Sequence, residues 1–149
     1  MTDGEILSRP LAGAQTVLVV DDVRVVRRVT YRLLSEAGYR VFEAASAAEA
    51  VEVLATAQRP IDLVIVDVIM PAVGGVELVR YIRTRWPALR VLFMSAYQAE
   101  VLVREGLERP NVIFLAKPFT RDELLDKVTA ALRREPALDA GAFRREQAT

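Results

Sequence analysis

Five side chains capable of chemistry each stand directly after a short apolar run. They are Asp21 and Asp22 after TVLVV, Asp67 after DLVIV, Ser95 after RVLFM and Lys117 after VIFLA. A single aspartate at the end of a strand ordinarily caps a helix or is solvated in a loop, so each residue alone means little. Their shared placement is more informative, because it predicts one site built from several segments.

Three clustered carboxylates would resist ionising together, because each negative charge disfavours the next. A hard divalent cation removes this difficulty, since Mg²⁺ is held by one or two carboxylates, waters and a phosphate oxygen. Mn²⁺ suits the same oxygen ligands. The Lys117 ammonium and the Ser95 hydroxyl can bind further phosphate oxygens. On the central strand, Asp67 is then the natural nucleophile toward phosphorus, giving an acyl phosphate.

The apolar runs are typical of buried parallel strands, because they are continuous and rich in β-branched residues. Five strands are expected, at 16–20, 39–44, 62–66, 90–94 and 112–116. Parallel strands end on one edge of a sheet, where open α/β sheets bind ligands. The five polar side chains are therefore expected to converge on one crevice.

Helical segments are expected between the strands. Val26, Val29, Leu33 and Ala37 form an apolar stripe in the first of them, and the segment 98–107 has a poorer period. Capping boxes, SAAE at 46–49 and TRDE at 120–123, mark two helix starts. Gly38 is expected to end the first helix. Five βα units in succession predict a parallel sheet with helices on both faces.

Composition narrows the class of protein. The 149 residues suit one domain at 15–134 with tails at 1–14 and 135–149. Twenty basic and twenty acidic residues cancel, so no global charge favours nucleic acid or a membrane. Cysteine and histidine are absent, which excludes disulfides, thiolate nucleophiles and zinc–thiolate sites. No membrane span or signal peptide is recognised, so a cytoplasmic location is expected.

Four motifs in order resemble the receiver domain of two-component response regulators, the CheY-like family. They are VLVVDD, DLVIVDVIMP followed by GG, VLFMSA and FLAKPF, within residues 15–134. The resemblance implies a flavodoxin-like, doubly wound (βα)5 fold with strand order 2-1-3-4-5. It also implies a cis bond between Lys117 and Pro118, and a turn glycine at Gly75.

The same resemblance implies roles for the site residues. Asp67 is expected to be the phosphoacceptor and Lys117 the phosphate-binding lysine. A Mg²⁺ site is implied for Asp21, Asp22, Asp67 and the backbone carbonyl of Ile69. Ser95 corresponds to the switch hydroxyl, and Phe114 to the switch aromatic, although an ordinary core aromatic would explain Phe114 equally simply.

The implied function is a phosphorylation-activated signalling switch, not an enzyme in the usual sense. Because the chain has no histidine, the phosphoryl group is expected to come from the phosphohistidine of a separate histidine kinase or phosphotransfer protein, or from a small donor such as acetyl phosphate. Ser95 would move toward the phosphoryl group and Phe114 into the vacated space. These movements would alter the surface of the fourth helical segment, the fifth strand and the fifth helical segment. The expected output is contact with a downstream protein, as a monomer or a phosphorylation-dependent dimer.

Two departures from the family concern the phosphoryl group. Ile69 and Tyr97 are bulky where many members have polar or small residues, which predicts slow self-dephosphorylation. The basic sequence at Arg24, Arg27 and Arg28 is interpreted as an exposed helical face, either merely solvated or part of the donor-binding surface.

Three alternatives stay open at this point. The chain could be the receiver segment of a hybrid histidine kinase or a phosphorelay intermediate, which VLFMSA and FLAKPF also resemble. A haloacid dehalogenase-type phosphatase would need a second aspartate where Ile69 stands. A nucleotide-binding module would need a glycine-rich turn where the chain has DDVR.

Overall fold

Five parallel strands form the centre of the molecule. The computed structural model describes residues 14–96 and 113–133. The strands are β1 (Thr16–Val20), β2 (Arg40–Ala44), β3 (Leu63–Asp67), β4 (Arg90–Ser95) and β5 (Ile113–Ala116). They lie in the order β2-β1-β3-β4-β5, with every neighbouring pair parallel. This confirms the expected sheet and strand order. The order in which successive strands are added to the sheet reverses between β1 and β3, and open α/β sheets bind ligands at such a position.

Burial explains the composition of each strand. All five residues of β1 and all five of β3 are buried, because these strands have neighbours on both sides and helices over both faces. The edge strand β2 is only partly buried, which accounts for its mixed sequence RVFEA. Two strands that are inaccessible to water therefore carry the carboxylates at their ends.

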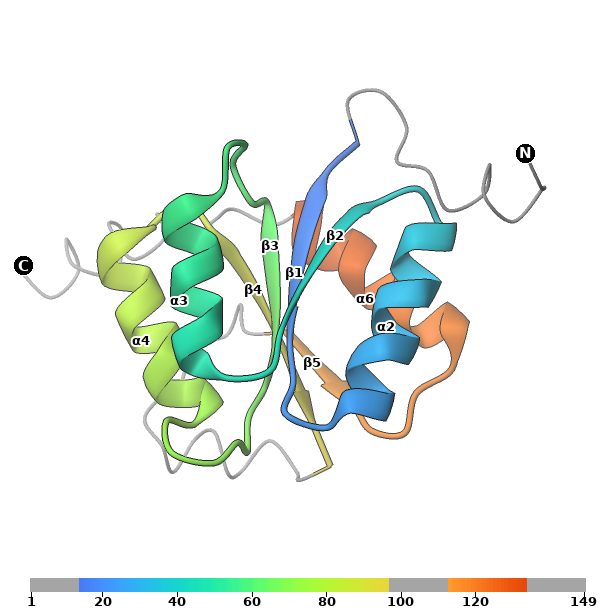
Figure 1. Cartoon of the computed structure of the whole chain (residues 1–149). Helices are drawn as coiled ribbons and strands as arrows, with labels where there is room; N and C mark the ends of the chain where they lie inside the picture. Colours follow the sequence, from blue (N-terminus) through green and yellow to red (C-terminus); the bar gives the residue numbers. More distant parts are fainter. Residues whose placement is uncertain (1–13, 97–112, 134–149) are drawn as a thin grey trace, which may run out of the picture.

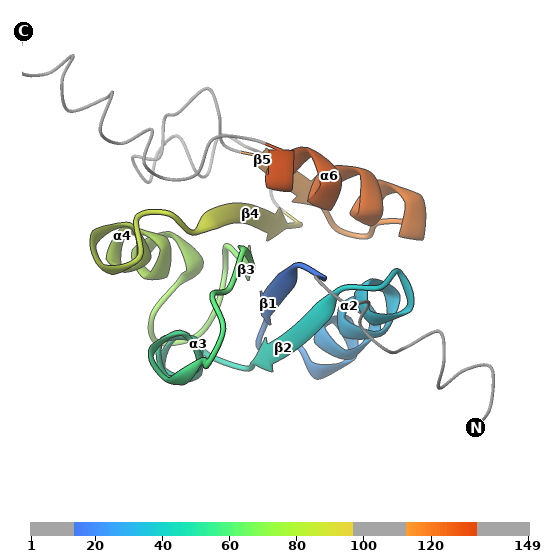
Figure 2. The same ribbon diagram turned by 90° about the horizontal axis from the view of Figure 1, so that it is seen from above.

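The helices form two layers, one on each face of the sheet (Figures 1 and 2). The described helices are α2 (Arg24–Glu36), α3 (Ala47–Thr56), α4 (Gly75–Arg85) and α6 (Arg121–Arg133). One apolar cluster joins α3 and α4 to the sheet, and a second joins α2 and α6 to the opposite face. The expected helical segment 98–107, Tyr97, residues 1–13 of the first tail and the whole second tail lie outside the described residues. Among the described residues, no helix has the length and apolar character to cross a membrane.

Local signals in the sequence set the ends of several helices. At the start of α3 the Glu49 N–H donates to the Ser46 hydroxyl at 3.1 Å. Before α6, Thr120 and Glu123 exchange two such bonds at 3.0 and 3.1 Å, the expected capping box. Gly38 follows the end of α2 with φ of 102°, a conformation that glycine adopts without strain.

The apolar stripe expected in the first helix is only partly correct: Leu33 packs against the second apolar cluster, but the buried residues lie beside the stripe. The buried residues of α2 are Thr30, Leu34 and Ser35, whereas Val29 is 49% exposed. Thr30 is tolerated inside because its hydroxyl donates to the Val26 carbonyl at 2.7 Å. A pattern that counts only apolar residues therefore misplaced the inner face of this helix.

Candidate functional site

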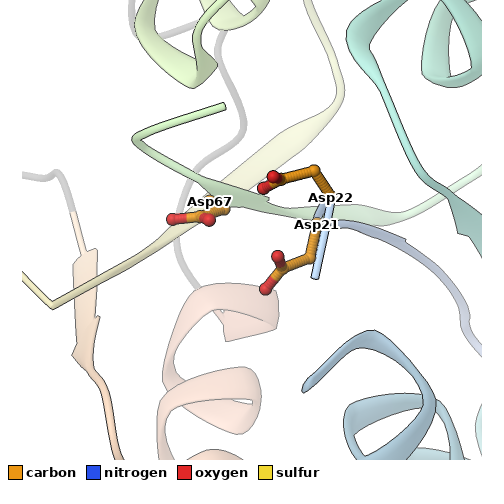
Figure 3. Close-up of side chains that lie close together, drawn as sticks. All are labelled: Asp21, Asp22 and Asp67. Carbon is orange, nitrogen blue, oxygen red and sulfur yellow. The ribbon is translucent and has the colours of Figure 1, made fainter. Parts of the chain in front are cut away.

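Three carboxylates meet where β1 and β3 end side by side (Figure 3). Asp21 and Asp22 follow β1, and Asp67 is the last residue of β3. Each offers an oxygen that lies within 4.8 Å of the other two. The structure thus confirms that these sequence-distant carboxylates converge at one edge of the sheet.

Asp21 is entirely buried, and each of its polar groups has a partner. Its N–H donates to the Ala44 carbonyl at 3.1 Å, and its own carbonyl accepts from Arg27 at 2.8 Å. Of the carboxylate oxygens, Oδ1 accepts from the Val23 N–H at 2.9 Å and Oδ2 from Lys117 at 2.7 Å. This residue is therefore held rigidly at the base of the site.

The Lys117 ammonium lies between two of the carboxylates. Its Nζ is 2.7 Å from Asp21 Oδ2 and 3.2 Å from Asp67 Oδ2, and its side chain is only 16% exposed. The residue follows β5, before the expected cis bond to Pro118, and its N–H donates to the Ser95 carbonyl at 3.0 Å. The packing of β4 against β5 therefore delivers this cation to the acidic cluster.

Asp67 is the carboxylate whose ionisation the site controls. Burial raises the pKa of Asp67 above its ordinary value of 3.8, opposed by the Lys117 ammonium and helped by the negative charge of Asp21. The Ile69 N–H donates weakly to Asp67 Oδ1 at 3.4 Å and favours the ionised form. Lys117 therefore partly offsets the cost of keeping this buried carboxylate charged.

The cluster suits a hard divalent cation. The three carboxylates and the single ammonium carry two net negative charges when all are ionised, which a divalent cation would balance. Asp22 is exposed, so its oxygens face the open side of the site, while Asp21 and Asp67 are buried. Oxygen ligands of this type are the ones that Mg²⁺ prefers, with water completing the shell. The residues present therefore fit the expected ion.

Ser95 lies on β4, the strand beside β3, and Phe114 lies on β5, the next strand outward. Ser95 is the buried last residue of β4. Phe114 on β5 pairs with Phe93 of β4, and their rings stack with centroids 6.1 Å apart. Because side chains two residues apart in a strand share a face, Ser95 is on the same face as these two rings. The expected switch pair therefore shares one face of the sheet.

Gly75 lies closer to the end of β3 than a turn glycine requires. It begins α4, and its N–H donates to the Val68 carbonyl at 2.9 Å. A Cβ atom here would lie 2.1 Å from the Asp67 carbonyl oxygen, whereas one on Gly74 would meet nothing closer than 3.5 Å. The GG pair in the sequence marks this contact, but it does not reveal which glycine makes it.

The exposed helical face expected at Arg24, Arg27 and Arg28 is wrong for Arg27. Its side chain is only 14% exposed and turns inward to the Asp21 carbonyl and to Glu43, whereas the Arg28 side chain is 55% exposed. A hydrogen bond to a backbone carbonyl cannot be predicted from the types of the neighbouring residues, because every residue has such a carbonyl. Sequence reasoning therefore assigned Arg27 to the wrong environment.

Comparison with known proteins covers most of the chain. The model of the response regulator receiver domain matches residues 17–129. The sensor kinase CckA of Brucella abortus is 35% identical over 125 residues, 84% of this chain but 13% of that protein. Response regulator MprA of Mycobacterium bovis is 38% identical over 124 residues, 83% of this chain and 53% of that protein. This chain thus spans only part of both proteins.

Shorter proteins match over nearly their whole length. Sporulation initiation phosphotransferase F of Bacillus subtilis is 32% identical over 114 residues, 76% of this chain and 90% of that protein. The chemotaxis protein CheY4 of Vibrio cholerae superposes with a TM-score of 0.72 at 29% identity, covering 79% and 98% of the two chains. Response regulator TrrA of Thermotoga maritima, solved in complex with Mg(2+)-BeF, gives 0.66 at 30% identity, covering 77% and 96%.

Proposed function

Because the chain belongs to the response regulator receiver domain family, we propose that it is a phosphorylation-activated switch with Asp67 as its phosphoacceptor. The observation that carries this proposal is the Lys117 ammonium, which lies within 3.2 Å of both Asp21 and Asp67. A cation held between two buried carboxylates is suited to receive the charge that a phosphoryl group adds.

In the proposed reaction an oxygen of Asp67 attacks phosphorus of a phosphohistidine. An O–P bond forms, the N–P bond breaks, and the released imidazole takes up a proton. Asp67 must be ionised to act as the nucleophile. Lys117 would shift from the Asp67 oxygen to a phosphoryl oxygen while it keeps its contact with Asp21.

Mg²⁺ would be held by Asp21, Asp22, Asp67 and the carbonyl of Ile69, where it would neutralise negative charge on the carboxylates and the phosphoryl oxygens. The net negative charge of the cluster supports this assignment. The similar TrrA protein, which was solved in complex with Mg(2+)-BeF, supports it independently. Mn²⁺ would satisfy the same ligands.

The proposed output is a change of packing on the side of β4 and β5. Ser95 would donate to the phosphoryl group, and Phe114 would move into the space beside it. The shared face of Ser95, Phe93 and Phe114 supports this coupling. The affected surface would include β5 and α6, and the partner there would be a downstream protein.

The phosphoryl donor would be a histidine kinase or phosphotransfer protein of a two-component system. A role as a phosphorelay intermediate is a second candidate, favoured by the match to the phosphotransferase over 90% of its length and to a sensor kinase. A dehalogenase-type phosphatase is not favoured, because the apolar side chain of Ile69 cannot serve as a general acid.

Incubation with acetyl phosphate and Mg²⁺, followed by intact mass measurement, tests the phosphoacceptor. We expect the added mass of one phosphoryl group, and no adduct in Asp67→Asn. Asp122→Asn is the matched control, because its side chain is 90% exposed and its ion pair is with Arg121, not with a residue of the site. An adduct that persists in Asp67→Asn, or that disappears in Asp122→Asn, would contradict the assignment.

A further inference from the structure

A half-buried arginine holds the peptide that joins the two adjacent carboxylates. Nη1 of Arg27 donates to the Asp21 carbonyl oxygen at 2.8 Å. That carbonyl belongs to the peptide group linking Asp21 to Asp22, so its direction sets where the chain leaves the buried strand. Because Asp22 is the exposed carboxylate of the cluster, its placement depends on this peptide more than on packing around its own side chain.

Glu43 fixes the arginine in turn. Its carboxylate accepts from Arg27 Nε at 3.3 Å and also pairs with Arg28. The Glu43 side chain is 19% exposed and comes from β2, the strand next to β1. The guanidinium thus donates through Nε to the Glu43 carboxylate and through Nη1 to the Asp21 carbonyl. Such a two-ended contact suits the planar fork of arginine, and lysine cannot reproduce it with one ammonium.

We propose that Arg27, anchored by Glu43, is a positioning residue for the divalent-cation site, acting through the Asp21 carbonyl on the direction of Asp22. The inference rests on the proposed function only in taking the three carboxylates to bind a divalent cation. Groups that orient metal ligands without touching the metal typically affect affinity about 10- to 100-fold.

The sign of the effect separates positioning from simple electrostatics. A guanidinium near a cation site repels the cation, so removal of its charge alone would tighten binding. Loss of positioning would weaken binding instead, because the carboxylates no longer start in the binding arrangement. Replacement of Arg27 by a neutral residue therefore has opposite outcomes under the two explanations.

Arg28 supplies the matched control. It lies one residue along the same helix, carries the same charge and pairs with the same Glu43 carboxylate. Its side chain is 55% exposed, and its ion pair is with Glu43, not with the acidic turn. Arg28→Gln therefore removes an equal charge without removing the contact to the Asp21 carbonyl.

Binding of Mn²⁺ to the full, unphosphorylated chain is measured by the electron paramagnetic resonance signal of the free ion, with competition by Mg²⁺. For Arg27→Gln we expect a Mn²⁺ dissociation constant raised about tenfold or more, and for Arg28→Gln one that is unchanged or lower. Arg27→Lys should recover only part of the loss. Glu43→Gln, which frees the guanidinium, should weaken binding in the same direction as Arg27→Gln.

A kinetic measurement distinguishes positioning from general damage. In phosphorylation by acetyl phosphate, Arg27→Gln should require more Mg²⁺ for half-maximal rate yet approach the wild-type rate at saturation. Unchanged or tighter Mn²⁺ binding by folded Arg27→Gln would overturn the proposal, as would an equal loss in Arg28→Gln. If Arg27→Gln does not fold, Arg27→Lys decides, because it keeps the charge: weaker Mn²⁺ binding supports positioning and unchanged binding overturns it. Failure of the wild-type chain to bind either ion would instead refute the proposed cation site itself.

Discussion

Gly75→Ala tests how closely α4 approaches the end of β3 at Asp67. The added methyl carbon would lie 2.1 Å from the Asp67 carbonyl oxygen and 2.9 Å from both the Asp67 carbonyl carbon and Val66 Cγ1. Contacts under 3.0 Å essentially never occur for a Cβ atom, so the helix and strand would have to separate by about 1 Å. The strand is fully buried, which leaves little room for such a shift.

The magnitude follows from two opposing effects. Alanine in place of glycine ordinarily stabilises a compatible position by about 0.4–1 kcal/mol, because it restricts the unfolded chain. Overpacking ordinarily costs about 1–3 kcal/mol, and a clash with backbone belongs at the upper end. We therefore expect Gly75→Ala to lower the free energy of unfolding by about 2 kcal/mol. It should also slow phosphorylation, because the shift displaces Asp67.

Urea unfolding followed by far-ultraviolet circular dichroism measures the first effect. A loss of about 2 kcal/mol corresponds to a midpoint lower by about 1 M. Gly74→Ala is the matched control, because its added carbon would meet only the Val68 carbonyl oxygen at 3.5 Å, an ordinary contact. If Gly75→Ala were as stable as Gly74→Ala, or more stable than the wild type, the close approach would be refuted.

Three further predictions concern the charges and the side chain at the rim of the site. Lys117→Met leaves the fully buried Asp21 without its ion pair, so the metal-free protein should lose about 3–5 kcal/mol of unfolding free energy, with part restored by Mg²⁺; an unchanged urea midpoint would contradict this. The pKa of Asp67 is raised, so its contribution to metal-free stability is fully present below pH 3.8 and is lost as the pH rises through the folded pKa. Asp67→Asn should therefore be the more stable protein at pH 7 without metal, with the difference shrinking toward acid and with Mg²⁺; equal stability at every pH would disprove the reasoning. Ile69 is 51% exposed, two residues after Asp67, and its side chain should obstruct the water that attacks the acyl phosphate. Ile69→Asn should therefore shorten the acyl-phosphate lifetime measured with Mg²⁺ present. An unaltered lifetime would show that Ile69 does not obstruct this water.

Residue types and their period were sufficient to predict the sheet and the gathering of the acidic residues. Continuous β-branched runs that alternate with helical segments favour buried parallel strands, and parallel strands end on one edge. Asp21, Asp22 and Asp67 were therefore expected together from the sequence, and the structure places their oxygens within 4.8 Å of one another. The capping box at Thr120 was equally visible, because both of its bonds join residues three positions apart.

Only the tertiary structure decided the contacts made through backbone atoms. Arg27 turns inward because the Asp21 carbonyl and Glu43 lie there, and Gly75 is needed because the Asp67 carbonyl lies against it. The inner face of α2, with Thr30 buried, likewise depends on how the helix is seated against the sheet. Backbone carbonyls are the same at every residue, so no residue type records where they point. The sequence alone therefore determined which side chains form the site, while the packing of the chain determined what holds them in place.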